Sequence, residues 1–139
     1  MTRKEFIGEL GTMIAVGAGM TFFVQSCGGP AYATARMQGD ELVVNKADVE
    51  ANELTIIRRP ASLPAPLCIS RKADGSYSAV LMKCTHKGCE LRPETKSLVC
   101  PCHGSEFSHS GKVLATPART DLQSFEIKTT ESSLLIRIH

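Results

Sequence analysis

The chain contains 139 residues, of which 16 are basic and 14 acidic, so its formal net charge is +2. This length accommodates a single domain. The basic residues form no stripe and are not interleaved with aromatic residues that could stack on bases, so we expect no nucleic-acid partner.

Residues 1–26 have the composition of a signal peptide or a membrane anchor. Arg3 and Lys4 precede an uncharged stretch from Leu10 to Val24, and its 15 residues suit a signal peptide better than a membrane span, which needs about 20. The run TRKEFI at 2–7 also resembles a twin-arginine export signal with lysine in place of the second arginine.

Cys27 follows in the run FVQSCG, which resembles a lipoprotein signal that is cleaved before an acylated cysteine. The alternative is an uncleaved N-terminal helix followed by a hinge at residues 28–30. Both interpretations predict a membrane-anchored protein on the periplasmic or extracytoplasmic side. In both, residues 27–41 form a linker of small and polar residues.

Residues 42–139 show short strands separated by turns, and no convincing helix is expected after the signal. The predicted fold is therefore all-β, with small antiparallel sheets. The expected strands are 42–44, 54–57, 67–69, 77–82, 97–99, 125–128 and 134–138.

Two similar runs lie between these strands: residues 84–89 read CTHKGC and residues 100–105 read CPCHGS. Each supplies one thiolate and one imidazole, as Cys84-x-His86 and Cys100-x-x-His103. A mixed-ligand two-iron cluster needs this set, with both cysteines on one iron and both histidines on the other. Because neutral imidazoles replace two thiolates, such centres span roughly −150 to +300 mV.

A tetrahedral zinc site is the competing interpretation of the same residues. Zinc sites usually place about two to four residues between paired cysteines and about three to five between paired histidines. The Cys84-x-His86 spacing is too tight for that pattern. Covalent haem attachment needs Cys-x-x-Cys-His, and residues 100–103 are one residue short of it. A framework of disulfides alone would leave both histidines without a role.

Both runs resemble the ligand boxes of the Rieske family, and the similarity extends from about residue 83 to residue 122. The resemblance implies a Rieske-type fold in which the ligand loops form a subdomain at one end. It also implies that Gly111 and residues 116–119 belong to a proline loop that covers a [2Fe-2S] cluster. The implied ligands are Cys84, His86, Cys100 and His103, with Cys89 and Cys102 forming the disulfide of the high-potential branch. A structural disulfide indicates an oxidising compartment.

The same resemblance assigns tuning roles to two residues beside the ligands. The Ser105 hydroxyl is expected to donate to a bridging sulfide, which stabilises the reduced cluster. Phe107 occupies the position of a tyrosine that donates to a ligand sulfur in the highest-potential relatives, so we expect a lower potential, better matched to menaquinol than to ubiquinol. Lys87 and Arg119 are either solvated charges or part of a basic docking tip for an acidic partner.

The expected function is one-electron transfer, with redox proteins and a quinol as candidate partners. The chain would act as a free-standing carrier or as the small subunit of a periplasmic oxidoreductase, such as an arsenite oxidase. The alternative is the Rieske subunit of a quinol-oxidising cytochrome bc complex. A ferredoxin component of an oxygenase is a third class, which Cys89, Cys102 and the export signal disfavour.

Overall fold

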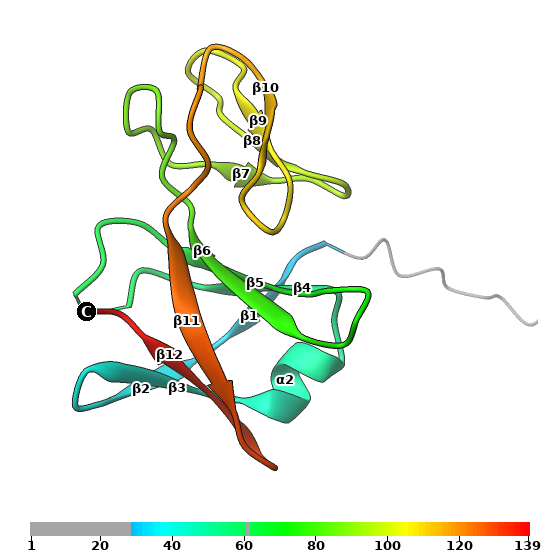
Figure 1. Cartoon of the computed structure of the whole chain (residues 1–139), viewed down its shortest axis with the longest axis vertical. Helices are drawn as coiled ribbons and strands as arrows, with labels where there is room; N and C mark the ends of the chain where they lie inside the picture. Colours follow the sequence, from blue (N-terminus) through cyan, green and yellow to red (C-terminus); the bar gives the residue numbers. More distant parts are fainter. Residues whose placement is uncertain (1–28, 61) are drawn as a thin grey trace, which may run out of the picture.

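The computed structural model describes residues 29–60 and 62–139, which form two β-sheets (Figure 1). In spatial order, the larger sheet contains β1 (Ala31–Ala33), β4 (Leu54–Ile57), β5 (Leu67–Arg71), β6 (Tyr77–Leu81), β11 (Ser124–Thr129), β12 (Ser133–Arg137), β3 (Glu41–Asn45) and β2 (Ala35–Gln38). The smaller sheet contains β10 (Val113–Ala115), β9 (Glu106–Phe107), β8 (Leu98–Val99) and β7 (Arg92–Pro93).

The predicted all-β fold is confirmed, with three local corrections. Residues 31–40, expected to be a linker, form β1 and most of the β2–β3 hairpin instead. Strand β1 pairs parallel to β4, so the larger sheet is not wholly antiparallel. A short helix, α2 (Lys46–Glu50), was also missed; the Asn45 side chain caps it by accepting a hydrogen bond from the Ala47 N–H at 3.0 Å.

The N-terminal predictions concern a different part of the chain. The proposed signal or anchor and Cys27 lie outside the described residues. Among the residues that the structure describes, no helix has the length and apolar character needed to cross a membrane.

Strands β4, β5 and β6 of the larger sheet are mostly buried on both faces, and this positions the two cysteine-rich loops. Ile56, Cys68 and Val80 lie opposite one another on β4, β5 and β6, and all three pack in the core that contains the two loops. Their neighbours along the strands face the second core, between the two halves of the larger sheet. Cys68 is a core residue, and burial raises its pKa to about 12.

The smaller sheet and its loops form a subdomain (Figure 1). The chain enters it after β6 and returns to the larger sheet at β11. Gly111 crosses the larger sheet at close range: a Cβ there would lie 2.9 Å from Val80 Cγ1, and its φ of +91° also favours glycine. Nearby, the Ser70 hydroxyl donates to the His109 carbonyl at 3.2 Å, and His109 lies half-buried at the junction of subdomain and sheet.

Candidate iron–sulfur site

The two cysteine-rich loops have the same backbone hydrogen-bonding pattern. In the first, the Cys84 N–H donates to the Cys89 carbonyl and the Gly88 N–H donates to the Cys84 carbonyl, both at 2.8 Å. In the second, the Cys100 N–H donates to the Ser105 carbonyl at 2.8 Å and the Gly104 N–H to the Cys100 carbonyl at 3.0 Å. Each loop is therefore a closed turn that begins at a cysteine proposed to bind iron.

A glycine makes each turn possible. Gly88 and Gly104 have φ values of +81° and +77°, a region that residues with a Cβ rarely adopt. Both follow their cysteine by four positions, and this shared offset is a sequence signal that could have indicated the matched geometry.

The loops place sulfur inside and imidazole outside. Cys84 and Cys100 are each 2% exposed, and both thiols are free. His86 is half-buried and His103 is exposed, and their ring centroids lie 5.0 Å apart with the rings perpendicular. Two imidazoles thus meet at the surface above two buried thiols.

Backbone and side-chain donors surround the Cys84 sulfur. Desolvation acts to raise the pKa of this thiol, but hydrogen bonds from the His86 and Lys87 N–H groups and from the Cys100 and Ser105 side chains together lower the pKa below its ordinary value. The site therefore favours a thiolate, which is the form that binds iron.

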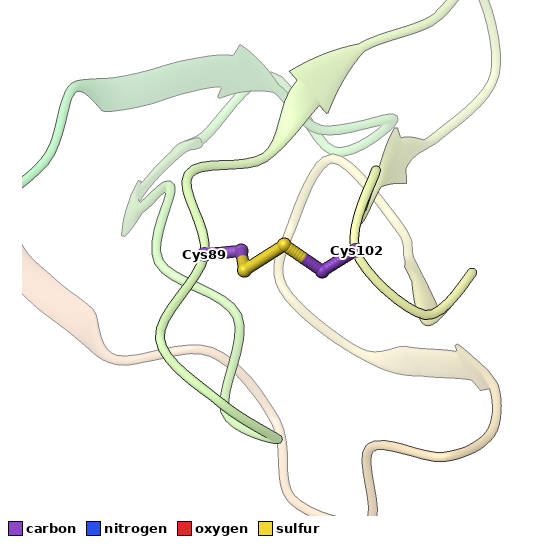
Figure 2. The surroundings of a disulfide bond; sticks show 2 residues. All are labelled: Cys89 and Cys102. Atoms are coloured by element: carbon purple, nitrogen blue, oxygen red, sulfur yellow. A yellow bond between two sulfur atoms is a disulfide. The ribbon is translucent and has the colours of Figure 1, made fainter.

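A disulfide between Cys89 and Cys102 joins the two loops (Figure 2). The two Cα atoms are 6.5 Å apart. The Cys100 sulfur lies within 4.8 Å of both bridge sulfurs, but these two are bonded to each other and offer no thiolate. The three sulfurs are therefore not a metal site by themselves, and Cys100 remains available to act with Cys84.

The predicted proline loop contacts both cysteine-rich loops. The Thr85 hydroxyl donates to the Thr120 carbonyl at 2.8 Å, and the Ala118 N–H donates to Ser105 Oγ at 2.9 Å. The Thr116–Pro117 peptide, which precedes both contacts in this loop, is cis. The sequence indicated the loop but not these contacts, since neither threonine carries a local signal for its partner.

Ser105 and Phe107 are both fully buried. The oxygen of the Ser105 hydroxyl accepts from Ala118, so its proton is free to donate toward the Cys84 sulfur. Phe107 packs in the same core cluster as Cys84 and Cys100. Position 105 thus supplies a hydroxyl donor to the Cys84 sulfur, while position 107 contributes apolar packing without a donor.

One buried atom without a hydrogen-bond partner fits the expected cluster. Among the described residues, His86 Nδ1 is buried without a hydrogen-bond partner, a costly state unless the nitrogen binds something. Two free thiols and two imidazoles are also a suitable donor set for iron with sulfide.

Comparison with known proteins identifies the family and its cluster. A family model, the Rieske [2Fe-2S] domain, matches residues 31–126. The cytochrome b6-f complex iron-sulfur subunit of Synechococcus elongatus is 28% identical over 151 aligned positions, which cover 98% of this chain and 84% of that protein. The corresponding subunit of Chlorobaculum tepidum is 30% identical over 66 residues, covering 46% of this chain and 36% of that protein.

A solved structure is also similar. The crystal structure of the cyanobacterial plasma membrane Rieske protein PetC3 from Synechocystis PCC 6803 aligns with a TM-score of 0.56 and 33% identity, covering 66% of this chain and 93% of that chain. The chain therefore belongs to the Rieske [2Fe-2S] family, as an electron-transfer protein with a [2Fe-2S] cluster that is related to cytochrome b6-f iron-sulfur subunits.

Proposed function

We propose that this protein passes single electrons on the extracytoplasmic side of a membrane, through a cluster bound by Cys84, Cys100, His86 and His103. One observation carries the proposal: two buried free thiols and two imidazoles with centroids 5.0 Å apart converge on two loops joined by a disulfide. The cysteines would hold one iron and the histidines the other, and the group would supply one-electron transfer when bound.

The histidines are the point of contact with the partner. Both cysteines are 2% exposed, whereas His103 is exposed and His86 half-buried, so a partner approaches the cluster most closely over the imidazoles. If His86 binds iron through its buried Nδ1, its Nε2 can hold or release a proton. An electron and a proton can then move together, which suits a quinol as donor.

We further propose that residues 1–26 export the chain and that Cys27 is lipidated. The family domain begins at residue 31, so this segment precedes it. A structural disulfide suits an oxidising compartment. The alternative for the same segment is an uncleaved membrane anchor.

Within this function, a free-standing carrier or small oxidoreductase subunit is the first candidate. It is supported by the exposed cation Lys87, which follows His86, and by the buried Phe107, which has no hydroxyl to donate. A subunit of a quinol-oxidising cytochrome complex is the second, favoured by the similarity to the Synechococcus elongatus subunit over 98% of the chain. Purification from native membranes in mild detergent separates them, because a complex subunit co-elutes with b-type haem and a free carrier does not.

Metal analysis and electron paramagnetic resonance test the ligand assignment. The reduced holoprotein should contain about two irons per chain and give the spectrum of a mixed histidine–cysteine [2Fe-2S] centre. His86→Ala and His103→Ala should each abolish that spectrum, whereas the control His139→Ala, at an exposed terminal histidine, should retain it. One zinc per chain in colourless protein would refute the assignment.

A further inference from the structure

The three loops at the cluster site carry cations and no carboxylate. We define the cluster tip as residues 83–89, 100–105 and 116–120, which contain the exposed Lys83, Lys87 and Arg119 and neither aspartate nor glutamate. Within the described part of the chain, none of these three cations takes part in an ion pair. Their charge is therefore not neutralised by a neighbouring carboxylate.

The carboxylates of the subdomain lie outside the tip, and most are engaged. Glu90 pairs with Arg59 at 3.0 Å and Asp121 with Lys112 at 2.7 Å. Glu106 accepts a hydrogen bond from the Ser97 hydroxyl, and Glu94 lies on the hairpin between β7 and β8. The charged side chains of the tip itself are therefore all positive, whereas the subdomain outside it carries both signs.

Local packing keeps the cations beside the ligand loops. A Cβ on Gly88 would lie 3.2 Å from Lys83 Cε, so the Lys83 side chain runs along the first loop, next to Lys87. Arg119 lies between two residues that are hydrogen-bonded to these loops, Ala118 to Ser105 and Thr120 to Thr85. The three charges therefore lie on the loops that carry His86 and His103 or on the loop that contacts them.

We propose that the cluster tip docks a redox protein whose electron-transfer face is acidic, an inference that rests on the proposed function. A partner that receives electrons through His86 and His103 must cover the tip. It then lies within the screening distance of about 8 Å at physiological salt from these cations. Carboxylates on its face would be attracted and would steer the encounter, whereas a basic face would be repelled.

Stopped-flow electron transfer with a matched pair of acceptors tests this inference. The probes are a basic c-type cytochrome and the same cytochrome after succinylation, which converts its lysines to carboxylates. The observed rate constant is measured with the full-length holoprotein across a salt series. The protein with the lower reduction potential is reduced beforehand and serves as the electron donor. We expect the succinylated form to react roughly 3–10-fold faster at low salt, with the advantage disappearing as salt is added.

Charge-reversal variants locate the effect. Lys87→Glu and Arg119→Glu should each reduce the rate with the succinylated cytochrome roughly 3-fold or more at low salt and leave the high-salt rate unchanged. Lys128→Glu is the matched control: it makes the same change in net charge at an exposed position on β11, in the larger sheet. Lys87→Gln should fall between the wild type and Lys87→Glu. Unchanged cluster spectra and potentials confirm that only docking was altered.

The outcomes that overturn the inference are distinct from those that overturn the function. Equal rates with both cytochromes at every salt concentration, or an equal loss of rate in Lys128→Glu, would refute docking on an acidic face while leaving electron transfer intact. If the reduced holoprotein, with its cluster spectrum present, transfers electrons to neither cytochrome, both the inference and the carrier function fail.

Discussion

The Thr85 hydroxyl donates to the Thr120 carbonyl at 2.8 Å, joining positions that are 35 residues apart. In the loop that contains Thr120, the Ala118 N–H donates to Ser105 Oγ. Residues 116–120 therefore connect the two cysteine-rich loops through hydrogen bonds to each, and the Cys89–Cys102 disulfide connects them directly. The loops of the proposed cluster site are therefore held together by contacts in addition to any that the cluster would supply.

Thr85→Val should loosen this enclosure while keeping a β-branched side chain of similar size. The lost hydrogen bond is worth about 0.5–1.5 kcal/mol, and it constrains the loop that carries Cys84 and His86. We expect faster loss of cluster absorbance on warming, with little change in the initial spectrum. Thr130→Val removes an exposed threonine hydroxyl that bonds to the Ser133 carbonyl at the turn between β11 and β12, and it should leave cluster lifetime unaltered. Equal lifetimes in wild type and Thr85→Val would contradict the bracing role.

Cys89→Ser should shorten the lifetime of the cluster more than Thr85→Val does. The disulfide spans a sequence separation of 13, and chain-entropy arguments give about 3 kcal/mol for a loop near this size. We expect the Cys89→Ser holoprotein to lose its visible absorbance faster at elevated temperature. Cys68→Ser, at a buried cysteine outside the bridge, controls for the loss of a sulfur in the same core. A bridge-free variant with an unchanged lifetime would show that the other contacts hold the loops.

Much of the fold follows from strand alternation, and the exceptions have local causes. The segment 67–70 is buried throughout and bounded by turn residues, which is a strong strand signal. In contrast, β1 and β2 are mostly small or polar residues and only partly buried, at the two edges of the sheet. Their extended structure comes from pairing with β4 and β3, which local sequence does not encode. Helix α2 buries a single residue, Val49, too few for a periodic signal.

The candidate site divides in the same way. Spacing indicated the cysteines, the histidines and the paired loops, because that information lies within six-residue runs. The contact of Thr85 with Thr120 and the position of His109 against Ser70 depend on how distant segments meet. Many exposed hydroxyls could have made such contacts, so the sequence could not predict which ones do.

Phe107→Tyr should raise the reduction potential if the ring edge lies toward a ligand sulfur. Phe107 is fully buried in one cluster with Cys84 and Cys100, so an added hydroxyl would enter a dry environment rich in sulfur. A hydrogen bond to a charged group is worth about 1.5–3 kcal/mol, but only the difference between redox states shifts the potential, so we expect tens of millivolts. Protein-film voltammetry measures the shift.

Two further variants test whether the shift in potential depends on the hydroxyl groups near the sulfurs. Ser105→Ala should lower the potential, because it removes the hydroxyl directed at Cys84. Phe125→Tyr makes the same chemical change against the other core and should leave the potential unchanged. A fall in potential for Phe107→Tyr would mean that the new hydroxyl points away from the sulfurs.

Asp121 should make a pH-dependent contribution to stability. The hydrogen bond from Lys112, followed by the Val113 N–H, holds the pKa of Asp121 below its ordinary value of 3.8. Because the folded-state pKa is depressed, this contribution is present above the ordinary value and is lost as pH falls through the folded-state pKa. The unfolding temperature of Asp121→Asn should therefore be lower than that of the wild type at pH 6. This difference in unfolding temperature should narrow as the pH falls below the ordinary pKa of the carboxyl group. A constant difference at all pH values would show that the charge is not responsible.

Cys27→Ser distinguishes the two modes of membrane attachment. If the chain is a lipoprotein, cleavage between Ser26 and Cys27 leaves an acylated N-terminus, which anchors it with about 0.8 kcal/mol per buried CH₂. Cys27→Ser should then move the protein from the membrane to the soluble fraction. An uncleaved apolar anchor would tolerate the change, since its hold does not depend on the thiol. Gln25→Ala, which places a small residue upstream of the cysteine, should be processed at least as well. Intact mass of detergent-extracted protein is the direct measurement, and detection of residues 1–26 in the mature membrane form would refute lipidation.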